Sequence, residues 1–186
     1  MSEHVCPWWI GYLLVSPIRR WMQNPEELIA PYVSPGMTVL EPGPGMGFFT
    51  LPLARRVGSG RVIAVDIQPK MLKTLRRRAT KAGLIQRIET RLARPDSLGL
   101  EDLKGTVDFV LVVAVVHEMP SAEAFFRQAA MALAPCGRLL FAEPAGHVNE
   151  TKFSEELAAA AKAGLQVKDR PMVKRCHAAL LAKQDI

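Results

Sequence analysis

The stretch that decides the fold is Val39-Leu40-Glu41-Pro42-Gly43-Pro44-Gly45-Met46-Gly47-Phe48-Phe49-Thr50. An apolar run ends in an acidic residue, three glycines alternate with other residues, and a helix-like segment follows. Glycines at this spacing let a strand turn sharply and let the backbone approach a ligand with no Cβ in between. The helix that follows points its unpaired N–H groups back into the turn. The stretch therefore predicts a strand–turn–helix unit with room for a ligand.

A second apolar strand follows at residues 61–65 and ends in Asp66. An acidic residue at the tip of the neighbouring strand, roughly 20 residues after the glycines, is placed to accept hydrogen bonds from ribose hydroxyls. Three glycines alone would equally suit an ordinary structural turn. Together with the distant aspartate, they indicate a nucleoside-binding site.

The glycine spacing separates two classes of nucleoside cofactor. The dinucleotide fingerprint is G-x-G-x-x-G, but here Gly47 comes one residue early and Phe48 stands where that fingerprint requires a small residue. The order acidic-x-Gly-x-Gly-x-Gly resembles motif I of the class I S-adenosylmethionine-dependent methyltransferases. The resemblance extends from about Met37 to the C-terminus, and it makes an NAD-dependent enzyme the less favoured interpretation.

The resemblance implies an α/β fold: a Rossmann-like, doubly wound, mostly parallel seven-stranded sheet with an antiparallel last strand, in an α/β/α sandwich. The continuous apolar run at 107–113 fits a central parallel strand covered on both faces. Two final strands, near 166–169 and 173–181, fit the closing hairpin. We expect residues 1–35 to form an N-terminal helical cap or lid, and residues 36–186 to form the S-adenosylmethionine-binding methyltransferase domain.

The same resemblance implies the cofactor, S-adenosyl-L-methionine, with S-adenosyl-L-homocysteine as its product. The acidic residue of motif I would lie near the methionine moiety, the glycines against the cofactor, and the acid after the second strand at the ribose. The loop after the third strand would lie along the adenine. The residues expected to bind the cofactor are Glu41, Gly43, Gly45, Gly47, Asp66, Ile67, Asp96, Ser97 and Ala114.

Candidate catalytic residues follow the fourth and fifth predicted strands. His117 and Glu118 follow the first of these, and Glu143 and His147 the second. Because ligands of open α/β sheets lie outside the carboxyl ends of the strands, these residues fall where a methyl acceptor would bind. His117 is the first choice for a general base, since imidazole titrates near neutral pH. The alternative is that His117 only hydrogen-bonds the loop backbone.

The N-terminal segment concentrates aromatic and polar side chains. They either close an exposed face of the core or form a lid over a small-molecule pocket, and the two roles are compatible. The residues expected to form this lid and to contact the acceptor are His4, Trp8, Trp9 and Tyr12.

The composition bounds the class of protein. A chain of 186 residues with 49% hydrophobic and 23% charged residues suits one soluble domain. Cys6, Cys136 and Cys176 are odd in number and widely separated, which argues against a disulfide framework and against a metal site, and suits a reducing cytoplasm. The apolar run at 8–15 is too short to span a bilayer, so no membrane partner is expected.

The net charge of +6 leaves two interpretations open. The arginine clusters at 19–20, 55–56 and 76–78 could form a basic patch that attracts nucleic acid, or they could be solvated helix faces. We favour the second, because the clusters fall in different predicted elements and the arginines of the helix near 69–83 lie off its apolar stripe.

The sequence therefore predicts methyl transfer to a small-molecule acceptor by direct in-line displacement. One alternative is an S-adenosylmethionine-binding or interaction module without turnover. Another is an RNA methyltransferase, since the motif I resembles that of ribosomal RNA adenine dimethylases. Those enzymes carry Asn-(Leu/Ile)-Pro-(Tyr/Phe) after the fourth strand, where this chain has Ala114-Val115-Val116-His117, so a nucleic acid partner is unlikely. Arsenite methylation would need several gathered thiols and ranks low. The sequence leaves homo-oligomerisation open.

Overall fold

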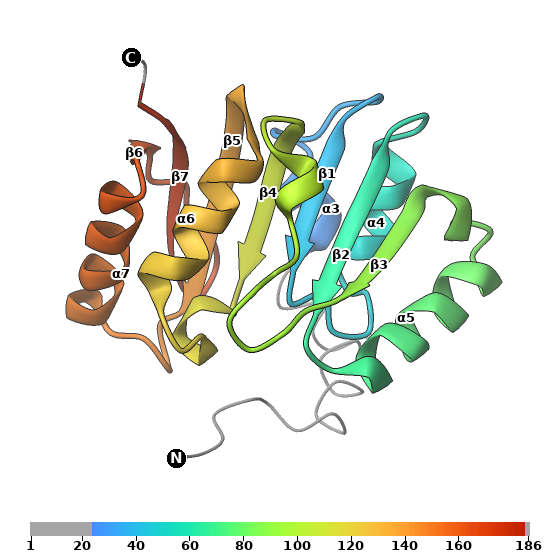
Figure 1. Ribbon diagram of the computed structural model, residues 1–186, viewed down its shortest axis with the longest axis horizontal. Helices are drawn as coiled ribbons and strands as arrows, with labels where there is room; N and C mark the ends of the chain where they lie inside the picture. Colours follow the sequence, from blue (N-terminus) through green and yellow to red (C-terminus); the bar gives the residue numbers. More distant parts are fainter. Residues whose placement is uncertain (1–23, 185–186) are drawn as a thin grey trace.

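A computed structural model describes residues 24–184 of the chain, and seven strands in it form one sheet (Figure 1). Their spatial order is β3-β2-β1-β4-β5-β7-β6. The strands are β1 (Thr38–Pro42), β2 (Arg61–Asp66), β3 (Ile88–Leu92), β4 (Val107–Val113), β5 (Leu133–Pro144), β6 (Leu165–Asp169) and β7 (Cys176–Lys183).

The direction of the strands confirms the expected sheet. The first five strands pair in parallel, whereas β7 runs antiparallel to both β5 and β6. The strand order reverses between β1 and β4, so the loops after these two strands diverge and leave a crevice position at the carboxyl edge of the sheet. The glycine turn at residues 43–47 follows β1, at this position.

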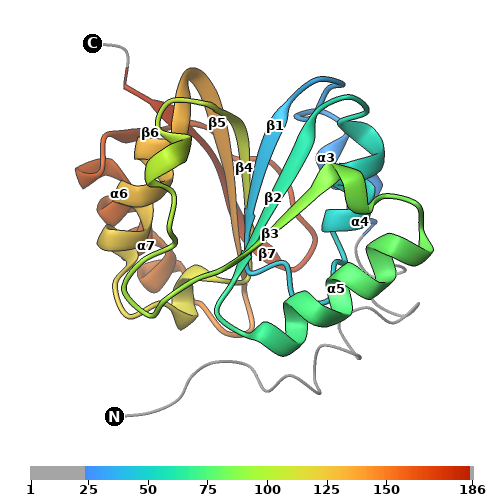
Figure 2. The ribbon, with the colours of Figure 1, turned by 45° about the vertical axis from the view of Figure 1, so that its right-hand side comes forward.

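Helices cover both faces of the sheet (Figures 1 and 2). α3, α4 and α5 lie on one face, and α6 and α7 on the other. Along β4, Phe109 and Leu111 belong to the hydrophobic core under α3, α4 and α5, while Val110 and Val112 belong to the core under α6 and α7. The helices are α3 (Pro25–Ile29), α4 (Thr50–Arg56), α5 (Pro69–Lys81), α6 (Ala122–Ala132) and α7 (Glu150–Lys162), with short 3₁₀ turns η1 (Ile85–Arg87), η2 (Glu101–Leu103) and η3 (Val116–Glu118).

Side-chain caps fix where several helices begin. The side chains of Asn24, Ser121 and Asn149 accept N–H groups from the first turns of α3, α6 and α7. The Asn149 cap starts α7 at Glu150. β7 starts at Cys176, whereas the sequence predicted a strand from about residue 173.

Residues 135–137 read Pro-Cys-Gly, which is typical of a turn, but they lie inside β5. Leu133 already pairs with Val107, and the register then jumps so that Arg138 pairs with Phe109. The intervening residues bulge out of the ladder, which is why the sequence reads as a turn there. Cys136 is exposed in this bulge, at the end of β5 away from the carboxyl edge.

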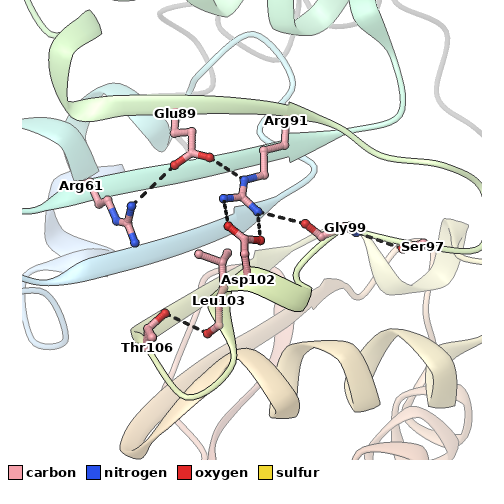
Figure 3. A network of polar contacts seen from close by, with 8 residues as sticks. All are labelled: Arg61, Glu89, Arg91, Ser97, Gly99, Asp102, Leu103 and Thr106. Atoms are coloured by element: carbon pink, nitrogen blue, oxygen red, sulfur yellow. Dashed lines mark hydrogen bonds and ion pairs between the residues drawn. The ribbon is translucent and has the colours of Figure 1, made fainter.

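The connection between β3 and β4 is a loop with one 3₁₀ turn, and a polar network attaches it to the sheet (Figure 3). Arg91 on β3 holds both carboxylate oxygens of Asp102, at 2.6 and 2.7 Å, and also donates to the carbonyl of Gly99. Its Nε contacts Glu89 at 2.6 Å. A bidentate guanidinium–carboxylate pair fixes orientation as well as distance, so this network positions the loop that carries the expected adenine contacts.

The described part of the expected cap, residues 24–35, packs into the main body of the protein. Ile29 and Val33 belong to the core under α4, and the ring of Tyr32 stacks on Phe109 with centroids 5.7 Å apart. Arg56 donates to the carbonyl of Val33 at 2.6 Å. The rest of the expected cap, residues 1–23, lies outside the described residues.

None of the helices in residues 24–184 has the length and apolar composition needed to cross a bilayer.

Candidate cofactor and acceptor site

Three glycines shape the turn after β1, and the structure gives them different roles. All three have positive φ, at +65° for Gly43, +53° for Gly45 and +87° for Gly47. A Cβ on Gly43 would lie 2.5 Å from Val115 Cγ2, and one on Gly47 would lie 2.5 Å from Leu75 Cδ1. A Cβ on Gly45 would meet no atom within 4 Å. Packing thus requires the outer two glycines, while the middle one borders open space.

Asp66, at the end of β2, is tied to this turn. Its Oδ2 accepts the backbone N–H of Gly45 at 3.3 Å, and its Oδ1 accepts that of Gln68 at 2.8 Å. Burial raises the pKa of Asp66 to about 6, against stabilising backbone hydrogen bonds from Gln68, Gly45 and Ile67, and the charge of Glu118 contributes to the rise. A carboxylate can accept about four hydrogen bonds, so some acceptor capacity stays open for ligand hydroxyls.

Glu41 lies buried at the end of β1. Its carboxyl group faces the hydroxyl of Thr50, and neither Oε2 nor that hydroxyl makes a well-formed hydrogen bond within residues 24–184. Burial raises the pKa of Glu41 to about 8, against a weaker lowering by Thr50, so the group is largely neutral at pH 7. A buried polar atom without a well-formed hydrogen bond is uncommon in folded proteins and leaves acceptor capacity for a ligand or water.

The expected adenine side of the site combines exposed side chains with a hydroxyl that is already hydrogen-bonded within the protein. Ile67 is 40% exposed and Leu92, at the end of neighbouring β3, is 60% exposed, so two apolar side chains meet solvent beside Asp66. Asp96 is exposed at the tip of a turn closed by backbone hydrogen bonds between Arg94 and Ser97. The hydroxyl of Ser97 accepts the N–H of Gly99 at 3.1 Å, so that oxygen already serves the loop.

Backbone strain marks the end of β4. Ala114 has a φ of +59°, in the left-handed region that favours glycine, and it is one of two such non-glycine residues in the described chain. This conformation turns the N–H groups of Val115 and Val116 toward one carboxylate oxygen of Glu143, at 3.2 and 2.7 Å. Strain of this kind persists at functional sites where the surroundings hold it in place.

His117 and Glu143 form a close pair across the ends of β4 and β5. His117 Nδ1 lies 2.5 Å from Glu143 Oε2, and the hydrogen bond to this carboxylate raises the pKa of His117 above its ordinary value of 6.5. His117 Nε2 lies 3.9 Å from Glu118 Oε1. The ring of His147, an exposed residue, is 5.8 Å from that of His117. The structure thus brings all four expected catalytic residues together at one edge of the sheet.

Glu143 nevertheless differs from the expectation that it would face a methyl acceptor. Its side chain is 0% exposed, and both carboxylate oxygens are already bound within the protein, one by Val115 and Val116 and the other by His117. A carboxylate held in this way orients an imidazole. It has no free face toward solvent, so any effect on a bound acceptor would have to pass through His117.

Arg78 was expected in water and is a functional candidate that the sequence analysis missed. It is partly buried, its Nη1 donates to the carbonyl of Met46 in the glycine turn, and burial lowers the pKa of the guanidinium. Its neighbours Arg76 and Arg77 are exposed, as expected. Position alone gives a faint signal, since Arg78 follows Leu75 by three residues on a helix and so borders the buried stripe.

A second missed residue is Glu156 on α7, which is buried with neither carboxylate oxygen hydrogen-bonded within the described chain. Burial raises its pKa to about 7, and the charge of Glu143 adds to the rise. The signal in the sequence was its spacing, because a glutamate three residues after Phe153 and one before Leu157 falls on the apolar face of the helix.

The remaining expected residues are simply placed. The lid residues His4, Trp8, Trp9 and Tyr12 lie outside the described residues. Within residues 24–184, no group of three or more histidine, cysteine or acidic side chains is arranged to hold a metal ion. A cavity of about 620 Å³ lies elsewhere, between α6, the end of α7 and the end of β7, and includes Arg127 and Lys183.

Comparison with known proteins gives a consistent result. A family model described as a methyltransferase domain matches residues 40–141, which is more than half of the chain. A structure described as a SAM-dependent methyltransferase from Aquifex aeolicus superposes with a TM-score of 0.85 at 24% identity, covering 95% of this chain and 98% of that one. At this identity the likeness is one of fold.

Curated relatives are longer than this chain. A ribosomal protein L11 methyltransferase from Pelotomaculum thermopropionicum is 34% identical over 146 residues, which are 77% of this chain and 42% of that protein. A ubiquinone/menaquinone biosynthesis C-methyltransferase from Hydrogenovibrio crunogenus is 29% identical over 126 residues, 67% of this chain and 48% of the relative. This chain therefore spans less than half the length of either relative.

Proposed function

This chain belongs to the class I S-adenosylmethionine-dependent methyltransferases, and on that premise we propose that it transfers the methyl group to a small-molecule acceptor. The observation that carries the proposal is the pair formed by His117 and Glu143, at the same sheet edge as the glycine turn. Burial is the main cause of the raised pKa of Asp66, and the charge of Glu118, next to His117, adds to it. The expected cofactor and acceptor groups therefore lie at the same edge of the sheet.

The residues around the turn fit the cofactor. Gly45 borders open space, Asp66 has acceptor capacity left for ribose hydroxyls, and Glu41 carries a buried oxygen without a well-formed hydrogen bond. Ile67 and Leu92 offer exposed apolar surface for an adenine ring. Gly43 and Gly47 support the turn through packing, and Asp96, Ser97 and Ala114 complete the proposed cofactor set.

When bound, S-adenosylmethionine supplies an electrophilic methyl group on a sulfonium, so the protein need not activate that side of the reaction. The chain itself must hold the acceptor in line, exclude water and, for a protonated acceptor, remove a proton. We assign proton removal to His117, with Glu118 and His147 as acceptor contacts.

The pair with Glu143 determines which nitrogen of His117 can act. A carboxylate acceptor at Nδ1 requires the hydrogen on that nitrogen, so in the neutral ring the lone pair is on Nε2. Nε2 lies on the side of the ring facing Glu118, away from the buried carboxylate. Because the pKa of His117 is raised, the neutral ring becomes the main form only above the ordinary value of 6.5. A thiolate or another soft anionic acceptor would need no base at all.

The test begins with calorimetric binding of S-adenosylhomocysteine to the purified protein, with NADH as the comparison ligand and Asp66→Ala as the control. Binding of the first compound alone, lost in the variant, supports the cofactor assignment and justifies an acceptor screen of small thiols, amines and phenols. Binding of neither compound would contradict the proposal. Binding with no methylated product from the full screen would favour the module without turnover.

Two further assignments rest on the same proposal. Residues 1–35 would act as a cap over residues 36–186, with His4, Trp8, Trp9 and Tyr12 at the acceptor. The cytoplasm is the proposed location, because three widely separated cysteines suit a reducing compartment.

A further inference from the structure

Glu156 is a carboxyl group at a core position that the proposed chemistry does not use. Its side chain is 2% exposed, and neither oxygen has a hydrogen-bond partner within residues 24–184. The residues that share its helix face, Phe153, Leu157 and Ala160, are buried and apolar. Because an isolated buried carboxylate is costly, such a group either holds a proton or serves a nearby charge.

The face of α7 that carries Glu156 packs toward β5, the strand that carries Glu143, which is the partner of His117. The rings of Phe153 and Phe141 stack with centroids 5.0 Å apart. Glu143 follows Phe141 by two residues on β5, so its side chain leaves the sheet on the same face. Glu156 follows Phe153 by three residues on α7 and is buried with it, so it lies on the same sheet-facing side of the helix. Glu143 in turn contacts His117, whose Nδ1 lies 2.5 Å from Glu143 Oε2.

We propose that Glu156 is a positioning residue that influences the protonation of His117 through the buried carboxylate of Glu143. The inference rests on the proposed role of His117 as the base. Two carboxyls in one buried patch cannot both ionise cheaply. Glu143 has three donors that stabilise its anion, whereas Glu156 has none within the described chain, so the proton stays on Glu156.

The consequence is a coupled titration. Burial and the Glu143 charge raise the pKa of Glu156 to about 7, and an ionised Glu156 in turn raises the pKa of His117. Loss of a proton from Glu156 therefore favours a proton on His117, so the charge of each group affects the titration of the other. At low pH Glu156 is neutral, and only Glu143 and Glu118 act on the imidazole.

Other charges around the pair are accounted for by their partners or distance. Lys152 and Glu155 lie on α7 and pair with each other at 3.3 Å, and Lys152 opposes the rise in the pKa of Glu156. Glu123 of α6 pairs with Lys162 of α7, His177 of β7 pairs with Glu150 of α7, and His147 lies in the loop after β5. The guanidinium of Arg170 lies 5.8 Å from the centre of the Phe153 ring, and Lys183 of β7 donates to the carbonyl of Leu133. Further cations on the packed elements are Arg127 of α6 and Arg138 of β5.

The experiment is an NMR titration of the full-length protein with ¹³C-labelled glutamate carboxyls and ¹⁵N-labelled histidines, from pH 5 to 9. We expect one glutamate signal, lost in Glu156→Gln, to titrate near neutral pH. The His117 signal, identified by its loss in His117→Gln, should show two inflections in the wild type and one in Glu156→Gln, at lower pH. Glu101→Gln, which changes an exposed glutamate on η2, should leave the His117 curve unchanged.

Two results would overturn the inference. One is a wild-type titration in which the Glu156 carboxyl ionises near its ordinary value of 4.5. The other is an identical His117 curve in the wild type and Glu156→Gln. The wild-type titration needs no variant that might misfold. Neither readout requires turnover or cofactor binding, so failure of the proposed function would be seen separately, in calorimetry and in the acceptor screen.

Discussion

The backbone N–H of Gly45 donates a hydrogen bond to Oδ2 of Asp66, 3.3 Å away, and so links the glycine turn after β1 to the tip of β2. The two parts that would meet opposite ends of the nucleoside are thereby held together within the protein. Preorganisation of this kind lowers the cost of ordering the site when a ligand binds.

Replacing Asp66 by alanine should weaken S-adenosylhomocysteine binding by at least tenfold. The change removes the ribose acceptor and also the carboxylate that holds the Gly45 N–H, and a hydrogen bond to a charged group contributes about 1.5–3 kcal/mol. In the wild type, affinity should also fall as the pH drops through about 6, where Asp66 gains its proton. Calorimetry at several pH values measures both effects. An exposed acid, Glu155, replaced by alanine should change neither of them.

Substitutions at Gly45 and Gly47 should have different effects on ligand binding and on the free energy of unfolding. Gly47→Ala forces a Cβ to within 2.5 Å of Leu75 Cδ1, so we expect the free energy of unfolding to fall by about 1–3 kcal/mol. Gly45→Ala meets no protein atom and adds only the strain of its positive φ, about 1 kcal/mol, but its methyl group enters the space proposed for the cofactor. Denaturant unfolding and ligand calorimetry on both variants would show the contrast. Equal effects on binding and stability in both would refute it.

His117→Gln should reduce turnover by about 10²–10⁴-fold, the usual contribution of a positioned base, while S-adenosylhomocysteine binding is retained. Glu143→Gln should also reduce turnover, because an amide N–H directed at Nδ1 would move the imidazole hydrogen to Nε2. Wild-type turnover should rise with pH through a value above 6.5, since the neutral ring is the active form and its pKa is raised.

The control for this prediction is His177→Gln, which removes an imidazole held by Glu150 at 2.9 Å rather than by Glu143. It should keep most of the activity. Full turnover in His117→Gln would mean either that His117 is not the base or that the acceptor is already an anion.

Arg78→Ala should weaken cofactor binding by about fivefold, because it removes the donor that holds the Met46 carbonyl in the glycine turn and a net hydrogen bond contributes about 1 kcal/mol. Arg77→Ala removes an exposed guanidinium from the next position of the same helix and should have no such effect. Parallel titrations with S-adenosylhomocysteine measure the difference. Equal losses in both variants would point to long-range charge instead of the turn.

Glu156→Gln should become more stable than the wild type as the pH rises. The folded-state pKa of Glu156, about 7, exceeds its ordinary value of 4.5, so the folded protein binds this proton more tightly than the unfolded chain. Wild-type stability from this group is therefore fully present below 4.5 and is lost as the pH rises to about 7. We expect the difference between the two proteins to grow by roughly 2 kcal/mol between pH 5 and pH 8 in urea unfolding. A constant difference would contradict the raised pKa.

The sheet and its turn could be predicted because their signals are local. Alternating glycines, an apolar central run and an acid at a strand tip each depend on only a few adjacent residues. The burial of Glu143 is different, because it requires the N–H groups of Val115 and Val116, which a left-handed Ala114 turns toward it. No periodicity in the sequence reports that backbone conformation.

Long charged side chains were the other source of error. The pattern of α5 places Arg78 off the apolar stripe, which suggests solvent, but a flexible stem lets a guanidinium reach a buried carbonyl at the edge of that stripe. Glu156 has the opposite problem. It lies on the stripe, where an apolar residue is expected, and its reason for being there depends on charges of β5 and η3 that meet it only in the folded protein.

The pairing of β1 with β4 has a consequence for how the molecule folds and opens. Only two residue pairs, Val39 with Phe109 and Leu40 with Val110, register this ladder, whereas β1 and β2 share five pairs and β5 and β7 share seven. The chain from β1 to β3 and the chain from β4 to β7 are thus joined in the sheet by a short ladder, beside which Gly43 packs on Val115, and both hydrophobic cores contain residues of the two parts. The proposed binding residues lie on both sides of it. A ligand bound there would contact both parts of the chain and stabilise their association. Its binding would therefore require that the two parts had packed together.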